Sequence, residues 1–366
     1  MAGIYIHIPF CAKRCIYCDF FSSVSIEKKS AYIDIICKEI EQRKGYLREK
    51  VQTIYFGGGT PSLFSAENLN CIIESIRSHF LLDADPEITL EANPDDLTPG
   101  YLESITSLPF NRLSIGIQSL CNSELDFLNR RHNAQEAITA VRNAQKANFN
   151  NISIDLMYGL PNSTSENWKN TLQQILDLGI QHISAYHLIY EEGTKLYHLW
   201  KTGKLRPISE ELSLRLFNIL IDTLERGGFE HYEISNFARP GFHSRHNSSY
   251  WEGKPYLGIG ASAHSFNGAC RSWNENRLDY SEAGRECELI DDQTAYNEFI
   301  LTRLRTHRGV DINELQTLFG EEKFVLFERR ADKYFQDGLI EKADNSYRLT
   351  RKGLFISDSI ISDLMD

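Results

Sequence analysis

The sequence predicts an α/β fold in which an incomplete (βα)6 barrel precedes an irregular α+β segment and a small C-terminal domain of winged-helix type. Short β-branched runs alternate with longer amphipathic stretches between residue 4 and about residue 188, as in βαβ units with a parallel sheet. Polar and glycine-rich residues follow the ends of these runs, at the rim where parallel α/β folds assemble their sites. That regularity favours a barrel over the alternative, a flat doubly wound sheet.

Six strands and four helices are expected in the first part of the chain. The strands are residues 4–8, 51–56, 87–90, 112–117, 152–157 and 183–187. The helices are residues 29–43, 66–80, 133–147 and 165–178. These elements place the barrel domain in residues 1–190.

Two further parts are expected after the barrel. Residues 191–290 are less periodic and rich in aromatic residues, and they form the α+β segment. Residues 291–366 form the C-terminal domain, with the helix, hairpin and helix order of a winged helix. The expected elements are a helix closed by Gly338, a hairpin that turns at Asn345-Ser346, and a last helix: residues 321–337, 339–341, 347–349 and 352–364.

Charge and hydropathy limit the classes of function. The formal net charge of −11 argues against a broad nucleic-acid surface, which needs clustered Lys and Arg. Acidic residues also outnumber basic ones in residues 291–366, so packing within the chain or against a partner is expected there rather than DNA binding. No apolar run reaches the roughly 20 residues that span a bilayer, and no secretory leader is visible. We therefore expect a cytoplasmic protein with reduced thiols.

Three of the eight cysteines crowd near the N-terminus. Cys11, Cys15 and Cys18 have the spacing C-x3-C-x2-C. Three thiolates on one short loop can bind three irons of a cubane and leave the fourth iron open to a chelating small molecule, whereas an electron-transfer cluster takes four cysteines. A structural zinc site is the alternative, although such sites usually pair two C-x2-C knuckles and this chain has no second one. The sequence therefore favours a [4Fe–4S] cluster.

This cysteine spacing resembles that of the radical S-adenosylmethionine (SAM) superfamily. The resemblance covers the barrel half and implies a [4Fe–4S] cluster whose open iron is chelated by the methionyl group of SAM. Gly57-Gly58-Gly59 follows the second expected strand and would let backbone carbonyls approach the methionyl ammonium, although a glycine run after a strand can also be only a turn. Glu91, Gln118 and Asp155 offer acceptors for the ammonium and the ribose hydroxyls, and Arg130 can pair with the carboxylate.

Longer stretches resemble one branch of that superfamily. Residues 5–11 (YIHIPFC), 57–61 (GGGTP) and 154–161 (IDLMYGLP) are similar to the oxygen-independent coproporphyrinogen III oxidases and the HemW-type haem chaperones. Matched residue by residue, the SAM contacts of that branch fall on nine positions: Tyr5, Tyr17, Gly58, Gly59, Thr60, Glu91, Gln118, Arg130 and Asp155. Tyr5 and Tyr17 have an alternative role, because an aromatic ring beside a cluster can simply exclude water.

Three features favour the chaperones over the oxidases. The oxidases resemble C-x3-C-x2-C-x-C, but this chain has Phe20 where their fourth cysteine stands. The oxidases also carry a sizeable N-terminal extension, whereas Tyr5 begins the first strand here. Residues 246–251 (HNSSYW) are similar to the H-N-x-x-Y-W motif of HemW-type proteins, in which the histidine is the proposed haem ligand. A neutral imidazole is a good axial ligand, so the resemblance makes His246 the candidate for the haem iron, against a purely structural role.

The resemblance implies a protein that binds haem, a [4Fe–4S] cluster and SAM and delivers haem to an acceptor haemoprotein. The acceptor can be membrane-bound, which would bring this cytoplasmic protein to the membrane surface during delivery. An electron donor such as flavodoxin or ferredoxin is also implied, and a homodimer is left open. Whether SAM is cleaved is open too, so no catalytic residue is assigned. The alternative function is that of the oxidases, a radical SAM oxidative decarboxylation of coproporphyrinogen III.

The sequence contains one other motif and five further cysteines. Residues 258–263 (GIGASA) match a dinucleotide-binding pattern but lack a βαβ context, so nicotinamide binding is not expected. In the family this segment lies near the cofactor cavity, which makes His264 a secondary candidate for the porphyrin or SAM pocket. The remaining cysteines are expected to be free thiols: Cys37, Cys71, Cys121, Cys270 and Cys287.

Overall fold

The structure, a computed structural model, describes residues 2–366 and has a curved parallel sheet at its centre. Six parallel strands lie side by side in chain order: β1 (Ala2–Ile8), β2 (Val51–Gly58), β3 (Leu82–Ala92), β4 (Arg112–Gln118), β5 (Ile152–Tyr158) and β6 (His182–His187). The predicted partial barrel is confirmed, and all six strands occur where they were expected. The third strand is longer than predicted, because it begins at Leu82 rather than at residue 87.

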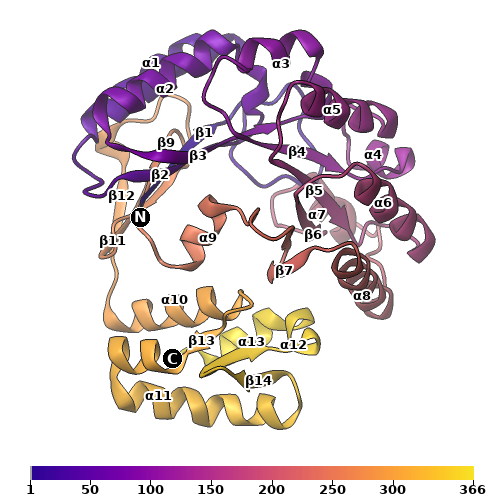
Figure 1. The fold of residues 1–366 in the computed structure, drawn as a ribbon, viewed down its shortest axis with the longest axis vertical. Helices are drawn as coiled ribbons and strands as arrows, with labels where there is room; N and C mark the ends of the chain where they lie inside the picture. The colour runs from indigo at the N-terminus through magenta and orange to yellow at the C-terminus, as the bar shows by residue number, and fades with distance from the viewer. Residues whose placement is uncertain (1) are drawn as a thin grey trace.

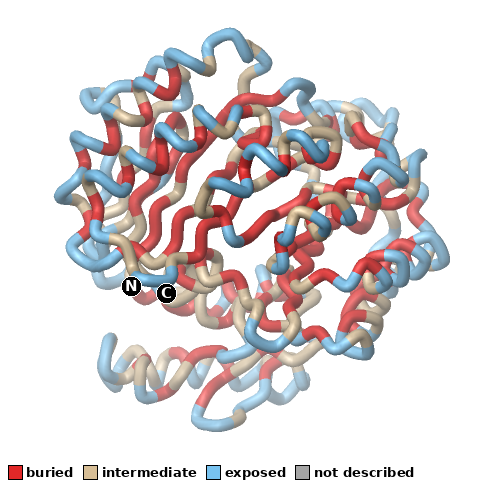
Figure 2. Tube along the Cα trace, turned by 45° about the horizontal axis from the view of Figure 1, so that its top comes forward, coloured by how far each residue is buried: buried red, intermediate tan, exposed pale blue. Residues whose placement is uncertain are grey.

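Helices cover the outside of this sheet (Figure 1). They are α1 (Lys29–Gln42), α2 (Ala66–His79), α3 (Pro99–Ile105), α4 (Asn122–Phe127), α5 (Ala134–Lys146) and α6 (Ser165–Asp177), with short 3-10 turns at Ile26–Lys28, Pro61–Leu63 and Pro94–Asp96. The four predicted helices are present, and the two shortest, α3 and α4, were not predicted because they are too short to show a clear period. Side chains of Ile4, Ile6 and Ile8 are fully buried between sheet and helices, and Figure 2 shows the same burial along the strands.

The segment after β6 adds strands to both edges of the sheet. At one edge β8 (Asn236–Ala238) and β7 (Glu230–Glu233) follow β6, and at the other β9 (Tyr256–Ile259) pairs in parallel with β1. Antiparallel strands β10 (His264–Phe266), β11 (Cys270–Trp273) and β12 (Glu286–Leu289) continue that second edge. The helices of this segment and a 3-10 turn are α7 (Lys195–Lys201), α8 (Glu210–Arg226), α9 (Arg245–Trp251) and Glu282–Gly284.

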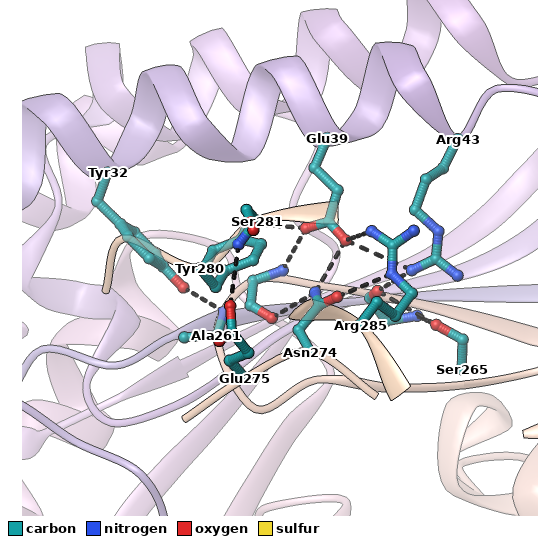
Figure 3. Close-up of polar contacts among 12 residues, drawn as sticks. Tyr32, Glu39, Arg43, Ala261, Ser265, Asn274, Glu275, Tyr280, Ser281 and Arg285 are labelled. Carbon is teal, nitrogen blue, oxygen red and sulfur yellow. Dashed lines mark hydrogen bonds and ion pairs between the residues drawn. The ribbon is translucent and has the colours of Figure 1, made fainter. Parts of the chain in front are cut away.

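A buried polar network fixes the β9–β12 edge to helix α1 (Figure 3). The Glu39 carboxylate, which is 3% exposed, accepts hydrogen bonds from Gly260 N (2.9 Å), Tyr280 Oη (2.7 Å), Asn274 Nδ2 (2.8 Å) and Arg285 Nη2 (3.0 Å). No helix follows the glycines at 258 and 260, because the chain turns there from β9 into β10. The expectation that this motif does not hold a dinucleotide agrees with that arrangement.

The C-terminal part has its own core and its own small sheet. Its elements are α10 (Asp292–Leu304), β13 (Val310–Asp311), α11 (Ile312–Gln336), β14 (Ile340–Ala343), β15 (Ser346–Leu349), α12 (Arg351–Phe355) and α13 (Ser357–Leu364). The order helix, hairpin, helix is the predicted one. The hairpin turn was misplaced by one residue, since Asp344 and Asn345 are the left-handed pair (φ 49° and 66°) and Ser346 already belongs to β15.

Two helices of the C-terminal part begin or end at other residues than predicted. The helix expected over 321–337 is the second half of α11, which starts at Ile312 and is interrupted at Gly320 (φ 83°, ψ 171°). The helix expected over 352–364 is two helices, because the chain breaks at Ile356. The C-terminal part docks on the rest through Arg351, whose Nη2 donates to Asn218 O of α8 (2.7 Å), and through backbone bonds such as His307 N to Tyr232 O (3.1 Å).

None of the helices within residues 2–366 combines the length and the apolar character that a bilayer-crossing segment needs.

Candidate functional site

The carboxyl ends of β1–β6 surround a cavity of about 490 Å³, which we call the thiol cavity. Its lining includes Cys11, Cys15 and Cys18 from the loop after β1. It also includes eight of the nine positions predicted from the sequence: Tyr17, Gly58, Gly59, Thr60, Glu91, Gln118, Arg130 and Asp155. The sequence pattern thus brings residues from five different strand ends to one place, as expected for a parallel α/β rim.

The cysteine loop is held from several sides. Cys11 N donates to Ser23 O (2.9 Å), and Ile16 packs in a small apolar cluster with Leu128 and Leu196 below the loop. Two side chains face the thiols: Thr60 Oγ1 donates to Cys11 Sγ (3.6 Å), and Arg130 Nη1 donates to Cys15 Sγ (3.3 Å). These donors are placed to stabilise thiolates on this loop.

The donor set fits an iron–sulfur cluster. Burial raises the pKa of Cys11, and it raises that of Cys18 to about 11, so both thiols keep their protons until a cation binds the sulfur. Within residues 2–366 no three His, Cys, Asp or Glu side chains are gathered closely enough to hold one metal ion. A cubane needs no such gathering, because each thiolate binds a different iron.

The glycine run at the end of β2 is required by packing. A Cβ on Gly58, whose φ is +110°, would lie 2.5 Å from the His7 ring. A Cβ on Gly59 would lie 2.8 Å from Phe10 O. Glycine is therefore needed for the end of β2 to lie against the end of β1, directly beside the cysteine loop. That reason is independent of any ligand.

Two carboxylates, on strands β3 and β5 with β4 between them, face the thiol cavity. Glu91 accepts a hydrogen bond from Tyr55 Oη (2.7 Å) and another from Gly58 N (3.2 Å), yet burial raises its pKa to about 7. Burial also raises the pKa of Asp155, which accepts from Ser114 Oγ (3.2 Å). Negative charge at this wall would be stabilised by a bound cation such as an ammonium group.

Two arginines face the same cavity. Arg130 was predicted, and its Nη2 also donates to Asn93 Oδ1 and Gly116 O. Arg112 was missed: it is 1% exposed, it lines the cavity, and its buried Nε has no hydrogen-bond partner within residues 2–366. A buried guanidinium without an ion pair is costly unless an anion joins it. The only signal in the sequence was an arginine at the first position of a buried strand.

Gln118 ends β4 in a conformation that few residues adopt. Its φ is +67°, and the pairing of β4 with β5 shifts register between Gly116 and Gln118. A left-handed residue other than glycine, asparagine or aspartate costs free energy, and such residues concentrate at functional sites. The strain turns the end of β4 so that Gln118 lines the thiol cavity.

Tyr5 is the one predicted SAM contact outside this lining. Its Oη lies 3.0 Å from His7 Nδ1, and it lines a second, larger cavity instead. Its ring is 6.2 Å from that of Tyr55, which does face the thiol cavity. Tyr5 thus stands in the wall between the two cavities.

His246 lies inside the protein. It is 1% exposed and lines neither of these two cavities. Its Nδ1 is 2.8 Å from Thr53 Oγ1, and its Nε2 is 2.8 Å from Tyr250 Oη. Burial lowers its pKa to about 3, so the ring is neutral. Both ring nitrogens are engaged in hydrogen bonds in this conformation.

Comparison with known proteins places the chain among relatives over its full length. The radical SAM superfamily profile matches residues 5–175, and that of the HemN C-terminal domain matches residues 290–356. "Heme chaperone HemW" of Lactococcus lactis is 31% identical over 99% of this chain and 96% of its own. The mouse "Radical S-adenosyl methionine domain-containing protein 1, mitochondrial" is 31% identical over 100% and 87%.

A solved structure shares the fold. Coproporphyrinogen III oxidase HemN from Escherichia coli superposes with a TM-score of 0.85, covering 100% of this chain and 90% of its own, at 22% identity. Together with the full-length relatives, this similarity confirms the predicted barrel with its small C-terminal domain and the predicted family.

Proposed function

The chain belongs to the HemW-type family of radical SAM proteins, and from that premise we propose that it is a haem chaperone. In this proposal it binds haem as cargo, together with a [4Fe–4S] cluster and SAM, and passes haem to an acceptor haemoprotein. The observation that carries the proposal is the thiol cavity, in a chain that aligns end to end with proteins named as haem chaperones. The oxidative decarboxylation of coproporphyrinogen III is the alternative function.

Cys11, Cys15 and Cys18 would hold the cluster. When bound, the cluster supplies a low-potential electron to a ligand on its open iron. Thr60 and Arg130 donate hydrogen bonds to two of the sulfurs and so favour their thiolate forms. Tyr17, which burial keeps protonated by raising its pKa, would cover the loop against water.

The charged side chains of the thiol cavity match the two charges of a methionyl group. Glu91 and Asp155 would take the ammonium and ribose hydroxyls, with Gln118 as a further polar contact. Arg130 and Arg112 would take the carboxylate. Backbone groups of Gly58 and Gly59 border the same space, and Tyr5 backs the wall behind Glu91.

His246 is the haem ligand that the family resemblance indicates. In the present conformation its ring is held between Thr53 and Tyr250. Ligation by His246 would therefore require both hydrogen bonds to break and the ring to leave the interior, at a cost of about 1 kcal/mol for each bond.

The proposal also divides the roles among the parts of the chain. Residues 1–190 would carry the cluster and SAM, and residues 191–290 with 291–366 would hold haem. The protein would act in the cytoplasm and meet the membrane only at a membrane-bound acceptor. Flavodoxin or ferredoxin would supply electrons, a homodimer is compatible with the proposal, and nucleic acid has no part in it.

The test separates chaperone from oxidase. The full chain, reconstituted anaerobically with iron and sulfide, is titrated with haem and followed by its absorption spectrum. We expect saturable binding and transfer of the bound haem to an apo-haemoprotein. The same preparation, given coproporphyrinogen III, SAM and a reductant, should form no protoporphyrinogen. Absence of haem binding, or robust protoporphyrinogen formation, would overturn the proposal.

A further inference from the structure

A second cavity, of about 1150 Å³, lies between the β9–β11 edge of the sheet and helices α10 and α11. We call it the aromatic cavity, because its walls include eight aromatic side chains from distant parts of the chain: Tyr5, Phe20, Tyr250, Trp251, Tyr256, Phe266, Phe299 and Phe319. Small-molecule sites usually measure about 300–1,000 Å³ and are lined mainly by apolar and aromatic groups. This cavity has the size and lining for a large planar ligand.

Apolar surface is left uncovered in this cavity. Phe20, on the cysteine loop, is 63% exposed, and Leu318, on α11, is 58% exposed. Exposed large apolar side chains that gather in one concavity mark a binding surface more often than scattered ones do. Phe20 also lines the thiol cavity, so the two cavities meet at this residue.

One histidine on the wall has free ring nitrogens. His264 is exposed, lines the aromatic cavity, and makes no side-chain hydrogen bond to any of residues 2–366, while its ring stacks on Trp273 (5.7 Å between centroids). His7 lines the same cavity, but its nitrogens are engaged by Tyr5 Oη (3.0 Å) and Phe21 O (3.0 Å). Desolvation and the nearby Arg271 lower the pKa of His264, which keeps the imidazole neutral and able to bind a metal.

The wall also offers one cation without a partner. Four cations and four carboxylates line the cavity, and Arg271, Arg303 and Lys323 are already paired with Glu298, Glu314 and Asp366. Lys254 forms no ion pair with any part of the chain that the structure describes. An ammonium group beside an apolar cavity is suited to the carboxylate of an otherwise apolar ligand.

We propose that haem is held in the aromatic cavity, with its iron bound by His264 and a propionate on Lys254. The inference rests on the proposed function and deepens it, because it names the site of the cargo. Aromatic walls match the porphyrin faces, the neutral imidazole matches the iron, and the ammonium matches the acidic edge. His264 is ready to bind without rearrangement, whereas His246 is not.

Haem titration of the full chain tests the ligand. His264→Ala should lose the absorption and paramagnetic resonance features of histidine-ligated haem and bind haem at least tenfold more weakly. Added imidazole should restore the spectrum, which would show that the variant is folded and its cavity intact. Lys254→Ala should weaken binding severalfold without changing the ligation spectrum. His198→Ala, an exposed histidine outside both cavities, is the control and should match the wild type.

The outcomes distinguish the proposed haem-chaperone function from the assignment of His264 as the haem ligand. If the wild type binds no haem, the proposed function fails. If the wild type binds haem and His264→Ala keeps the same spectrum and affinity, the proposed function stands and the assignment of His264 is overturned. Loss of ligation in His246→Ala with retention in His264→Ala would overturn it as well and point to the buried histidine.

Discussion

The two cavities of this protein are built in different ways. The thiol cavity, of about 490 Å³, takes its lining from the carboxyl ends of successive parallel strands and holds the three cysteines together with carboxylate and arginine side chains. The aromatic cavity, of about 1150 Å³, is closed by segments as far apart as Phe20 and Lys323 and is mostly apolar in character. The first is a product of the barrel itself, and the second exists only because the β9–β11 edge and the C-terminal helices meet.

The two cavities depend on different contacts. Residues of the thiol cavity stay in place as long as the six parallel strands pair. The aromatic cavity depends in addition on the Glu39 network, which fixes the edge that carries His264, and on contacts such as that between Arg351 and α8. Apart from Phe20, which lines both, changes at the residues of one cavity should therefore leave the other cavity largely intact.

The largest effect is expected at the cysteine loop. Cys15→Ala should reduce the iron bound after anaerobic reconstitution from about four atoms per chain to none, because a cubane with two thiolate ligands is not held. Haem titration of the same variant should be nearly unchanged if the cavities are independent. Cys71→Ala, an exposed thiol on α2, is the matched control. Full iron content in Cys15→Ala would remove this loop as the cluster site.

The next effect concerns the wall of the aromatic cavity. Glu39→Ala should lower the free energy of unfolding by roughly 3–5 kcal/mol, since Arg43 and Arg285 would lose a carboxylate in the interior. Urea denaturation measures the loss. Glu74→Ala removes an exposed partner of Arg77 and should cost at most about 1 kcal/mol. Equal effects of the two substitutions would mean that the network does not hold the edge.

A smaller effect is expected at Arg112. Arg112→Gln should weaken SAM binding roughly tenfold or more, because a charged hydrogen bond to the methionyl carboxylate contributes about 1.5–3 kcal/mol. Equilibrium dialysis of the reconstituted protein gives the affinity, and a thermal melt without SAM checks that the variant folds. Arg77→Gln, exposed on α2, should bind SAM as the wild type does. Unchanged SAM affinity in Arg112→Gln would leave the buried guanidinium without a ligand role.

The thiol cavity, built from strand ends, could be predicted from the sequence better than the aromatic cavity, built from distant segments. Strands such as 112–117 and helices such as 133–147 were found because their residues repeat with a clear period, and site residues that follow strand ends, such as Glu91 and Asp155, were found with them. Arg112 was missed because an arginine at the first position of a buried strand is a weak local signal, which does not show that the side chain is buried or that it faces the site. The short strands β7–β12 were missed since three or four residues carry no period.

For the two candidate haem ligands, the sequence could suggest a histidine but could not show its surroundings. A motif pointed to His246, but its burial and its bonds to Thr53 and Tyr250 depend on distant segments that no local pattern encodes. His264 lies beside a glycine motif, and only the fold shows that its ring faces a cavity and lacks a partner. Tertiary contacts between remote segments are what the sequence alone could not supply.

The smallest effect is a pH dependence at Glu91. Its pKa is raised from 4.5 to about 7, so the unfolded chain ionises first and the contribution of Glu91 to stability should be lost as the pH rises from 4.5 to about 7. Only the ionised form attracts an ammonium, so SAM affinity should rise severalfold between pH 5.5 and 7.5, below the range of about 7.7–8.0 where an α-amino group loses its proton.

Glu91→Gln isolates this titration. Glu233, whose pKa is also raised to about 7, titrates in both proteins, so the difference between the wild type and the variant reports Glu91 alone. We expect the variant to bind SAM more weakly at pH 7.5 and to lose most of the pH dependence, while haem binding in the aromatic cavity keeps its own profile. A variant that shows the wild-type pH dependence of SAM affinity would place the titrating group elsewhere, and a parallel change in haem affinity would mean that the two cavities are coupled.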